Sequence, residues 1–340
     1  MALKTNKQGK PIYNILDHSH GIAKETVVIN WLLGNTCNFK CNYCPDFLHS
    51  GSTGWPQKKQ IIAFIDAIAD HVAPKKIYFE FTGGEVTLYK ELLEIATYVR
   101  DSGHTVGIIS NGSMSLSWWK RNKEYLDHVC FSYHTEFGNP EKFLKIIKEV
   151  NQTMRTHVNI MMDPQNWDNC ITLAERIPQE CKNISLALQP LMEELGANET
   201  VYKYTEEQQE VLDRQHHLYG SKIKWDANFP VPRGAMNMID TRNQLSEISS
   251  AHRLISNEIN DWSEWWCWAG LENFVVDHDG SLWRGWCREG GSLGNIYSEI
   301  ILPEEPWLCK KGFCHCNYDI MCKKEKGNAW KTRVQMVETC

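Results

Sequence analysis

The chain has 340 residues, 42% of them hydrophobic and 23% charged, so it can bury a substantial core and has neither a disordered nor a membrane-spanning composition. Its net charge is −6, from 36 Lys and Arg against 42 Asp and Glu, and its basic residues are dispersed, which argues against nucleic acid as a partner. No apolar run approaches the roughly 20 residues of a membrane span, and the N-terminus lacks a signal-peptide core. We therefore expect a cytoplasmic protein without membrane contact.

After an N-terminal extension at residues 1–26, apolar runs alternate with segments of helical periodicity. Strands are predicted at residues 27–35, 76–82, 105–110, 129–134, 156–162 and 183–191. Helices are predicted at residues 58–72, 89–102, 117–126, 141–151, 167–177 and 206–220. Repeated strand–helix units imply a parallel sheet with right-handed crossovers. We predict an α/β fold, a partial (β/α)6 TIM-like barrel at residues 27–225, with its site at the C-terminal ends of the strands.

The pattern changes in residues 226–340. A helical stretch is predicted near residues 243–260, and a hairpin follows, with strands at 272–277 and 281–286. Asp279-Gly280 between the two apolar runs is the turn signal. Cysteine-rich loops complete this region, which we predict to be a small α+β domain.

The chain contains 13 cysteines, a high count for a protein of a reducing compartment, where cysteines more often bind metal or do chemistry than form disulfides. Their distribution supports metal binding, because three cluster near residue 40 and a second group lies between residues 267 and 322. Cys130, Cys170 and Cys181 are scattered over predicted strands and helices and are expected to be buried.

The first cysteine group, Cys37, Cys41 and Cys44, has the spacing C-x3-C-x2-C directly after the first predicted strand. Three thiolates on one loop can hold three irons of a cubane cluster and leave the fourth iron open, as a catalytic metal requires. Zinc fits poorly, because no fourth ligand is close in the sequence. Three unrelated core cysteines are the remaining alternative.

At these residues the chain resembles the radical S-adenosylmethionine (radical SAM) superfamily, over about residues 27–220. The resemblance rests on the cysteine motif with aromatic Tyr43 before its last cysteine, and on Gly-Gly-Glu after the second strand. It implies that Tyr43 contacts the adenine of SAM and that the Gly-Gly-Glu segment binds the methionine amino group. Glycines let a backbone approach a ligand, and a carboxylate suits an ammonium. The SAM-binding residues implied in this way are Tyr43, Thr82, Gly83, Gly84, Glu85, Ser110, Asn111, Ser132 and His134; for His134 a structural role is an equal alternative.

The chemistry implied by the resemblance begins with a catalytic [4Fe-4S] cluster on Cys37, Cys41 and Cys44. The reduced cluster cleaves SAM to methionine and a 5′-deoxyadenosyl radical, which takes a hydrogen atom from the substrate. A flavodoxin- or ferredoxin-type protein is the expected electron donor. The protein's share is positioning, electron supply and exclusion of water.

The second cysteine group resembles the SPASM or twitch extensions of radical SAM enzymes, which hold auxiliary [4Fe-4S] clusters. The candidate ligands are Cys267, Cys287, Cys309, Cys314, Cys316 and Cys322. Their later spacing departs from the SPASM pattern, so we predict one twitch-type cluster on Cys267, Cys287, Cys314 and Cys316. Cys309 or Cys322 is the alternative for one of the last two. A zinc site on the same residues, with His315, remains open.

Tryptophans crowd this region, including Trp262, Trp265 and Trp268. They form either a stacking platform for a sugar, nucleoside or peptide, or the core of a small domain; packing is favoured. We expect a radical SAM oxidoreductase or isomerase that dehydrogenates or epimerises a small molecule, since residues 1–26 are too short for a peptide-recognition domain. Modification or crosslinking of a ribosomal peptide is the first alternative, and a non-catalytic metal-binding scaffold or assembly factor is the second.

Overall fold

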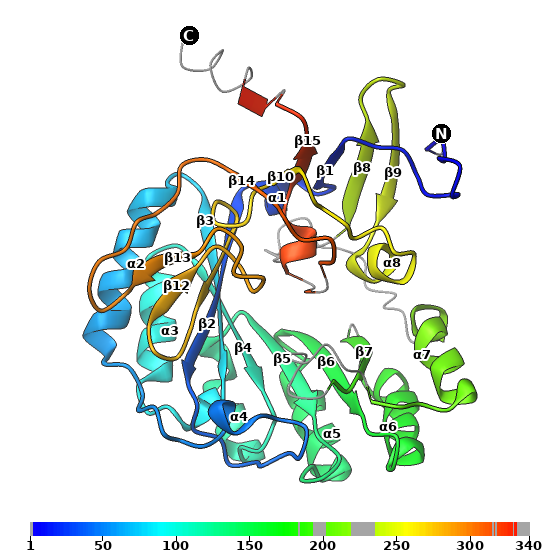
Figure 1. Cartoon of the computed structure of the whole chain (residues 1–340). Coiled ribbons are helices and arrows are strands. Elements are labelled where there is room, and N and C mark those ends of the chain that lie inside the picture. Colours follow the sequence, from blue (N-terminus) through cyan, green and yellow to red (C-terminus); the bar gives the residue numbers. More distant parts are fainter. Residues whose placement is uncertain are drawn as a thin grey trace. The chain divides into compact units, whose positions relative to one another are not determined.

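A computed structural model of the chain (Figure 1) describes residues 3–182, 184–192, 202–218, 235–314, 316, 318–328 and 330–331. The chain divides into two compact units. The first unit comprises Met1–Asn30, Asp66–Tyr78 and Asp226–Cys340, and the second comprises Trp31–Ile65 and Phe79–Trp225. The division passes through β2 (Thr26–Gly34), α2 (Lys58–Val72) and β3 (Lys76–Gly83).

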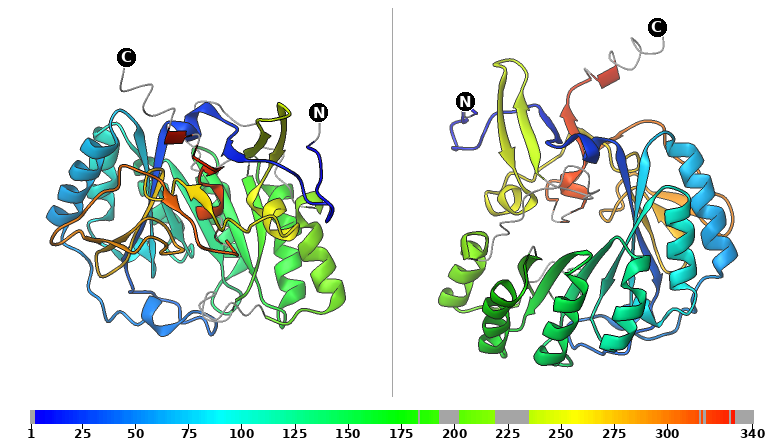
Figure 2. Two further views of the ribbon diagram at one scale, coloured as in Figure 1. Left: turned by 45° about the horizontal axis from the view of Figure 1, so that its top comes forward. Right: turned by 180° about the vertical axis from the view of Figure 1, so that it is seen from behind.

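The second unit is built on parallel strands in the order β2-β3-β4-β5-β6-β7. Its further strands are β4 (Thr105–Ser110), β5 (His128–Tyr133), β6 (Arg155–Met162) and β7 (Ile184–Pro190). Its helices are α3 (Leu92–Asp101), α4 (Leu116–Asn122), α5 (Pro140–Val150), α6 (Trp167–Glu180) and α7 (Glu206–Leu218), with 3₁₀ turns η1 (Asp46–Leu48), η2 (Val86–Leu88) and η3 (Lys123–Tyr125). Helices α3 to α6 line the outer face of these strands (Figure 2).

The sequence explains which face each strand turns to the helices. Along β6, buried Val158, Ile160 and Met162 alternate with partly exposed His157 and Asn159, because successive side chains of a strand point to opposite faces. Helix α5 begins where Asn139 accepts a hydrogen bond from Lys142 N at 2.9 Å, a standard N-cap. β2 is buried along its whole length, as its continuous apolar run predicts.

The predicted α/β class and parallel sheet are confirmed, and the six predicted strand–helix pairs are present with shifted ends. The helix predicted at 89–102 begins only at Leu92, with three residues between it and the preceding 3₁₀ turn η2. Helix α6 continues through Pro178 to Glu180, although a proline usually ends a helix. Closure of this sheet into a partial barrel stays a prediction.

The first unit contains an antiparallel sheet in the order β14-β10-β15-β1-β8-β9. Its strands are β1 (Ile15–His18), β8 (Met236–Asp240), β9 (Leu245–Ser249), β10 (Trp265–Cys267), β14 (Trp307–Leu308) and β15 (Lys324–Lys326). The unit also contains α1 (Gly21–Lys24), α8 (Ala251–Ser256), the 3₁₀ turn η5 (Asp319–Met321), and the strands β11 (Asn273–Val276), β12 (Ser281–Trp283) and β13 (Ser292–Asn295).

Two predictions for this unit need correction. Residues 1–26 are not a separate extension, because β1 pairs with β8 and β15 and fills a central position in the sheet. The helix predicted at 243–260 is instead strand β9 followed by the short helix α8, since residues 245–249 pair with β8. The hairpin at Asp279-Gly280 is confirmed, with β11 and β12 antiparallel and Gly280 at a φ of 82°.

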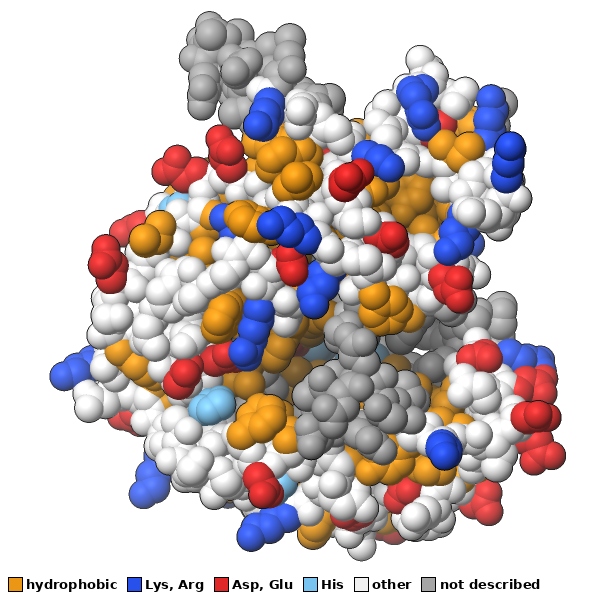
Figure 3. Space-filling view, in the orientation of Figure 1, with side chains coloured by type: hydrophobic (Ala, Val, Ile, Leu, Met, Phe, Trp, Pro, Cys, Tyr) orange, Lys and Arg blue, Asp and Glu red, His pale blue; other side chains and the backbone are white. Residues whose placement is uncertain are grey.

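The core of the first unit mixes cysteines with aromatic side chains. Trp262 and Trp265 are buried and pack edge to face, with ring centroids 5.2 Å apart, and Tyr13 lies against both. Packing is therefore confirmed for these two tryptophans. Over the face shown in Figure 3, acidic and basic side chains are interspersed.

In the described part of the chain, no helix is long and apolar enough to span a membrane. The described cysteines are all free of disulfides, and Cys130, Cys170 and Cys181 are buried as predicted. His315 and Cys340 lie outside the described residues.

Candidate cluster and cofactor sites

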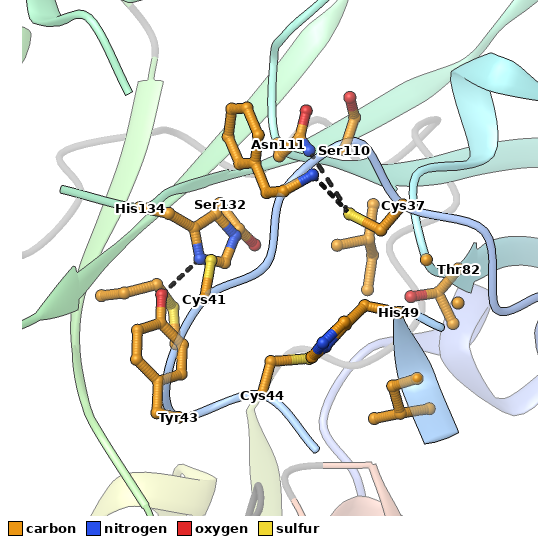
Figure 4. A pocket seen from close by; sticks show the side chains of 16 residues that line it. Cys37, Cys41, Tyr43, Cys44, His49, Thr82, Ser110, Asn111, Ser132 and His134 are labelled. Atoms are coloured by element: carbon orange, nitrogen blue, oxygen red, sulfur yellow. Dashed lines mark hydrogen bonds between the residues drawn. The ribbon is translucent and has the colours of Figure 1, made fainter. Parts of the chain in front are cut away.

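A cavity of about 190 Å³ opens at the C-terminal ends of the strands of the second unit. Figure 4 shows residues of the cysteine loop beside residues of the strand ends, with Cys37 next to Asn111 and Tyr43 joined to His134. Its walls are Cys37, Phe39, Cys41, Tyr43, Cys44, Leu48, His49, Thr82, Gly83, Gly84, Ile109, Ser110, Asn111, Ser132, His134 and Met161. Residues from five segments of the chain thus meet at one place, where parallel α/β folds form their sites.

The three cysteines of the loop share this cavity. The Sγ of Cys37 accepts hydrogen bonds from Phe39 N at 3.4 Å and from Asn111 Nδ2 at 3.8 Å. Burial raises the pKa of all three thiols, to about 12 for Cys41 and about 11 for Cys44, and neighbouring negative charges add to the effect. Three bare thiolates would repel one another here, so the site suits a group that brings positive charge to the sulfurs, as iron does in a cluster.

Gly83 and Gly84 pack against the backbone from which the cysteine loop starts. Gly83 has a φ of 125°, and a Cβ there would lie 2.3 Å from Gly34 O. A Cβ on Gly84 would lie 2.2 Å from Thr36 O. Hydrogen bonds from Gly84 N to Gly34 O and from Glu85 N to Thr36 O, both 2.8 Å, hold the two segments together. The two glycines are therefore needed for a close approach of backbone to backbone, in addition to any role toward SAM.

Glu85 does not line the cavity, although the resemblance implies that its segment binds SAM. Its carboxylate is buried and accepts hydrogen bonds from Thr87 N at 3.1 Å and Thr87 Oγ1 at 2.6 Å. It also accepts from Ser110 Oγ at 2.9 Å and Asn111 N at 2.7 Å. These bonds leave one acceptor position on Oε2. Glu85 thus joins the ends of β3 and β4, and a direct contact with SAM stays a prediction.

Tyr43 and His134 meet across the cavity. Their rings stack with centroids 5.9 Å apart, and the Tyr43 hydroxyl hydrogen-bonds to His134 Nδ1. Burial lowers the pKa of His134 to about 4, so the imidazole is neutral near pH 7 and can accept the phenol proton at Nδ1. The pair fixes the aromatic side chain that precedes the last cysteine of the loop.

The structure also places residues at the cavity that the sequence did not single out. His49 lines it with a side chain about 10% exposed, and in the described part of the chain its Nδ1 has no hydrogen-bond partner. Glu136 accepts hydrogen bonds from Asn42 N at 3.2 and 3.3 Å and so holds the cysteine loop from outside. No local sequence motif predicts His49 or Glu136, because the place of each depends on contacts between segments that are distant in the sequence.

The second cysteine group lies in the first unit. Cys267, Cys309, Cys314 and Cys322 belong to one buried core. Burial raises the pKa of the Cys287, Cys309 and Cys314 thiols, to about 12 for Cys314, and the neighbouring Cys267 thiolate raises each further. Cys267 is therefore close to all three.

Which of Cys309, Cys316 and Cys322 would join Cys267, Cys287 and Cys314 as a ligand stays a prediction. Cys316 is less buried than Cys309 and Cys314, and loss of hydration together with the charges of Asp319 and Cys314 raises the pKa of its thiol. Cys322 is fully buried, and its Sγ lies 3.8 Å from Tyr318 O. Among the described residues, no three His, Cys, Asp or Glu side chains stand as ligands of a single metal ion.

Comparisons with known proteins agree with the resemblance over part of the chain. Residues 31–177 match the family model of the Radical SAM superfamily. This segment, less than half of the chain, is therefore similar to the domain of radical SAM enzymes, a family that binds a [4Fe-4S] cluster and SAM.

Three curated relatives differ in their reactions. The 7-carboxy-7-deazaguanine synthase of Methanocaldococcus jannaschii is 26% identical over 176 residues, 46% of this chain and 72% of the relative. The S-adenosylmethionine-dependent nucleotide dehydratase of Selenomonas ruminantium is 31% identical over 26% of this chain and 31% of the relative. The Fe-coproporphyrin III synthase of Methanosarcina barkeri is 33% identical over 27% of this chain and 22% of the relative. The chain thus covers less than a third of the last two relatives.

Two solved structures share the fold. Streptococcus suis SuiB bound to precursor peptide SuiA aligns with a TM-score of 0.54 at 13% identity, over 82% of this chain and 64% of that chain. Histidine-tagged anSMEcpe with bound AdoMet aligns with a TM-score of 0.50 at 16% identity, over 81% of this chain and 79% of that chain. At these identities the likeness is one of fold alone.

Proposed function

We propose that this protein cleaves SAM reductively and uses the resulting radical to dehydrogenate or epimerise a small polar molecule such as a sugar or nucleoside. The observation that carries the proposal is the cavity at which Cys37, Cys41 and Cys44 meet the ends of β3, β4 and β5. When bound, the cluster and SAM supply one-electron cleavage of the sulfonium bond to a 5′-deoxyadenosyl radical.

The chain's own residues hold and shield these groups. Cys37, Cys41 and Cys44 would be the cluster ligands, and the N–H donors on Cys37 Sγ would stabilise its thiolate. Tyr43, fixed by His134, would present its ring to the adenine. The buried wall of the cavity would keep water from the reactive carbon.

A polar row next to this cavity supports a substrate rich in hydrogen-bonding groups. Ser132 and Met161 line the cavity, and the same faces of β5 and β6 continue with Cys130, Asn159 and His157. His157 Nδ1 lies 2.7 Å from Ser185 Oγ on β7, and its Nε2 lies 2.9 Å from Asn159 Oδ1. Asn159 Nδ2 donates to Cys130 Sγ at 3.3 Å. A polar ligand can exchange hydrogen bonds with such a row, whereas an apolar one would leave it desolvated.

The names of two curated relatives, a deazaguanine synthase and a nucleotide dehydratase, also favour a small molecule of the nucleoside type. The peptide bound to SuiB favours the alternative, modification of a ribosomal peptide or protein. A twitch-type auxiliary [4Fe-4S] cluster in the first unit belongs to the proposal, with Cys267, Cys287, Cys314 and Cys316 as its ligands and Cys309 or Cys322 as the alternative for one of the last two. We further propose a flavodoxin- or ferredoxin-type electron donor and a cytoplasmic location.

Anaerobic reconstitution with iron and sulfide tests the radical chemistry. With SAM and dithionite, the wild type should form 5′-deoxyadenosine and a Cys37/Cys41/Cys44→Ala variant should not. About four irons left on the variant correspond to one auxiliary cluster, and about eight to two. A wild type that binds zinc, or binds iron but never cleaves SAM, would favour the scaffold or assembly-factor alternative.

A second assay separates the substrate classes. Nucleosides, nucleotides, sugars and short peptides are added one class at a time, and the rate of 5′-deoxyadenosine formation is compared with the substrate-free rate. Stimulation by nucleosides or sugars supports the small-molecule proposal. Stimulation by peptides alone would replace it with the peptide-modifying alternative.

A further inference from the structure

A lysine lies buried in the middle of the second cysteine group. Lys324 is 1% exposed and sits directly opposite Cys267 in the antiparallel pair of β15 and β10. Directly opposed residues of such a pair project to the same face, with Cβ atoms about 5 Å apart. The ammonium therefore lies on the side of the sheet where the Cys267 thiol lies.

The hydrogen bonds of Lys324 fix the position of its ammonium, but all of their acceptors are uncharged. Nζ donates to Asp319 O at 2.6 Å, Ile320 O at 3.1 Å and Cys322 O at 3.1 Å, so its three protons all bind carbonyl groups. Nζ also lies 5.1 Å from the centre of the Trp262 ring. The ammonium is thus fixed in position and makes no direct bond to a thiol or carboxylate among the described residues.

The side-chain carboxylate of Asp319, whose backbone oxygen binds Lys324, is buried and held by other groups. Asp319 accepts hydrogen bonds from Cys287 N at 2.6 Å, Trp286 N at 3.1 Å and Asn273 Nδ2 at 3.1 Å. Gly285 packs so tightly on it that a Cβ there would lie 2.5 Å from Asp319 Oδ1. Asp319 therefore anchors the loop that carries Cys287 and offsets only part of the lysine's charge.

A second cation approaches from the other side of β10. Arg284 stacks its guanidinium 5.6 Å from the centre of the Trp307 ring, and Trp307 is the residue opposite Cys267 in the pair of β10 and β14. Its Nη1 donates to Glu305 O at 3.2 Å, whereas its buried Nε has no partner in the described part of the chain. Cys267 thus has cationic side chains near it on both flanks.

A buried ammonium among uncharged thiols costs several kcal/mol, because its hydration is lost and nothing of opposite charge replaces it. The cost is recovered when the thiols become thiolates on a metal cluster. A [4Fe-4S] cluster with four thiolates is an anion, and reduction by one electron makes it more negative. A nearby positive charge therefore stabilises the reduced form more than the oxidised form, and raises the reduction potential.

We propose that Lys324, assisted by Arg284, sets the reduction potential of an auxiliary cluster on the neighbouring cysteines so that it accepts an electron from the substrate. This inference rests on the auxiliary cluster of the proposed function. In a dehydrogenation the substrate radical loses one electron and one proton. The electron balances the one-electron reduction of that cluster, and the proton goes to water. Lys324 is proposed to act through the cluster and not on the reacting atoms, so it is a positioning residue.

The test uses the full chain with Cys37, Cys41 and Cys44 replaced by alanine, so that auxiliary iron alone contributes to the signal. Lys324→Met, Lys324→Arg and Arg284→Met are added one at a time. Lys323→Met is the matched control, because Lys323 is the preceding residue and its ammonium lies over another ring, with Nζ 4.4 Å from the centre of the Trp268 ring. Each protein is reconstituted anaerobically, its iron is counted, and its midpoint potential is measured by EPR-monitored titration.

Lys324→Met should lower the equilibrium constant for reduction about tenfold, which is about 59 mV for one electron. Arg284→Met should lower it by a smaller factor, about threefold, because Arg284 is partly exposed and water screens its charge more than that of buried Lys324. Lys324→Arg and Lys323→Met should stay within a factor of two of the parent. A purely structural role for Lys324 would not produce this pattern.

An iron-retaining Lys324→Met protein with an unchanged potential would overturn the inference. If the Lys324→Met protein does not hold iron, the midpoint potential of Arg284→Met is used in its place. An unchanged potential of Arg284→Met would then overturn the inference. A parent that holds no auxiliary iron would refute the auxiliary cluster itself, and the inference with it. Formation of 5′-deoxyadenosine by the wild type is scored separately, so failure of the radical chemistry is distinguishable from failure of this inference.

Discussion

Replacing Gly84 with alanine tests the conclusion that backbone packing, rather than ligand approach alone, demands this glycine. The added Cβ would lie 2.2 Å from Thr36 O and 2.5 Å from Thr36 C, closer than any unstrained contact. These neighbours are backbone atoms, so a side-chain rotation cannot relieve the clash. The cysteine loop must move away from the end of β3.

The size of the effect follows from what that movement breaks. Hydrogen bonds from Gly84 N to Gly34 O and from Glu85 N to Thr36 O, each 2.8 Å, join the two segments. Losing both costs about 2 kcal/mol, and overpacking adds about 1 kcal/mol or more. We expect Gly84→Ala to lower the free energy of unfolding by about 3 kcal/mol, the sum of these two effects.

Urea unfolding and iron content after anaerobic reconstitution measure this effect. Gly54→Ala is the control, because a Cβ there meets no atom within 4 Å. Gly84→Ala should unfold at lower urea and retain less iron on Cys37, Cys41 and Cys44, while Gly54→Ala should match the wild type. Equal stability and equal iron in the two variants would refute the packing argument.

Three further predictions concern single side chains. Glu85→Gln should lower the free energy of unfolding, measured in urea, by about 2 kcal/mol, since one buried donor loses its acceptor. A higher KM for SAM at unchanged stability would instead indicate that Glu85 contacts SAM. His49→Gln should weaken SAM binding about tenfold and leave the iron content unchanged, because we expect the buried imidazole of His49 on the cavity wall to hydrogen-bond to SAM. Unchanged SAM binding, measured by equilibrium dialysis, would exclude this contact. Burial lowers the pKa of His128 from 6.5 to about 3, so the unfolded chain takes up the proton first as the pH falls below 6.5. When the pH falls from 7.5 to 5.5, the wild type should lose about 1.4 kcal/mol more free energy of unfolding than His128→Gln does. Equal losses for the two proteins, measured by urea unfolding at both pH values, would contradict the lowered pKa of His128.

Local patterns were sufficient wherever the interacting groups are close in the sequence. Cys37, Cys41 and Cys44 lie within eight residues on one loop, so their shared site could be predicted from spacing alone. Strand and helix periods predicted the order of the second unit, because each element there packs beside its sequence neighbours. The placement of Ser110, Asn111 and Ser132 at the cavity followed from the rule that parallel strands end at one edge.

The tertiary structure alone decided which distant groups face one another. Strand β1 joins the sheet with β8 and β15, although more than 200 residues separate it from either. Glu85 is committed to Thr87, Ser110 and Asn111, and Lys324 is buried opposite Cys267. The physical reason is that strand register and burial fix these contacts. Neither leaves a periodic signal near the residue concerned, so a buried lysine in this sequence looks like any surface lysine until the strands are paired.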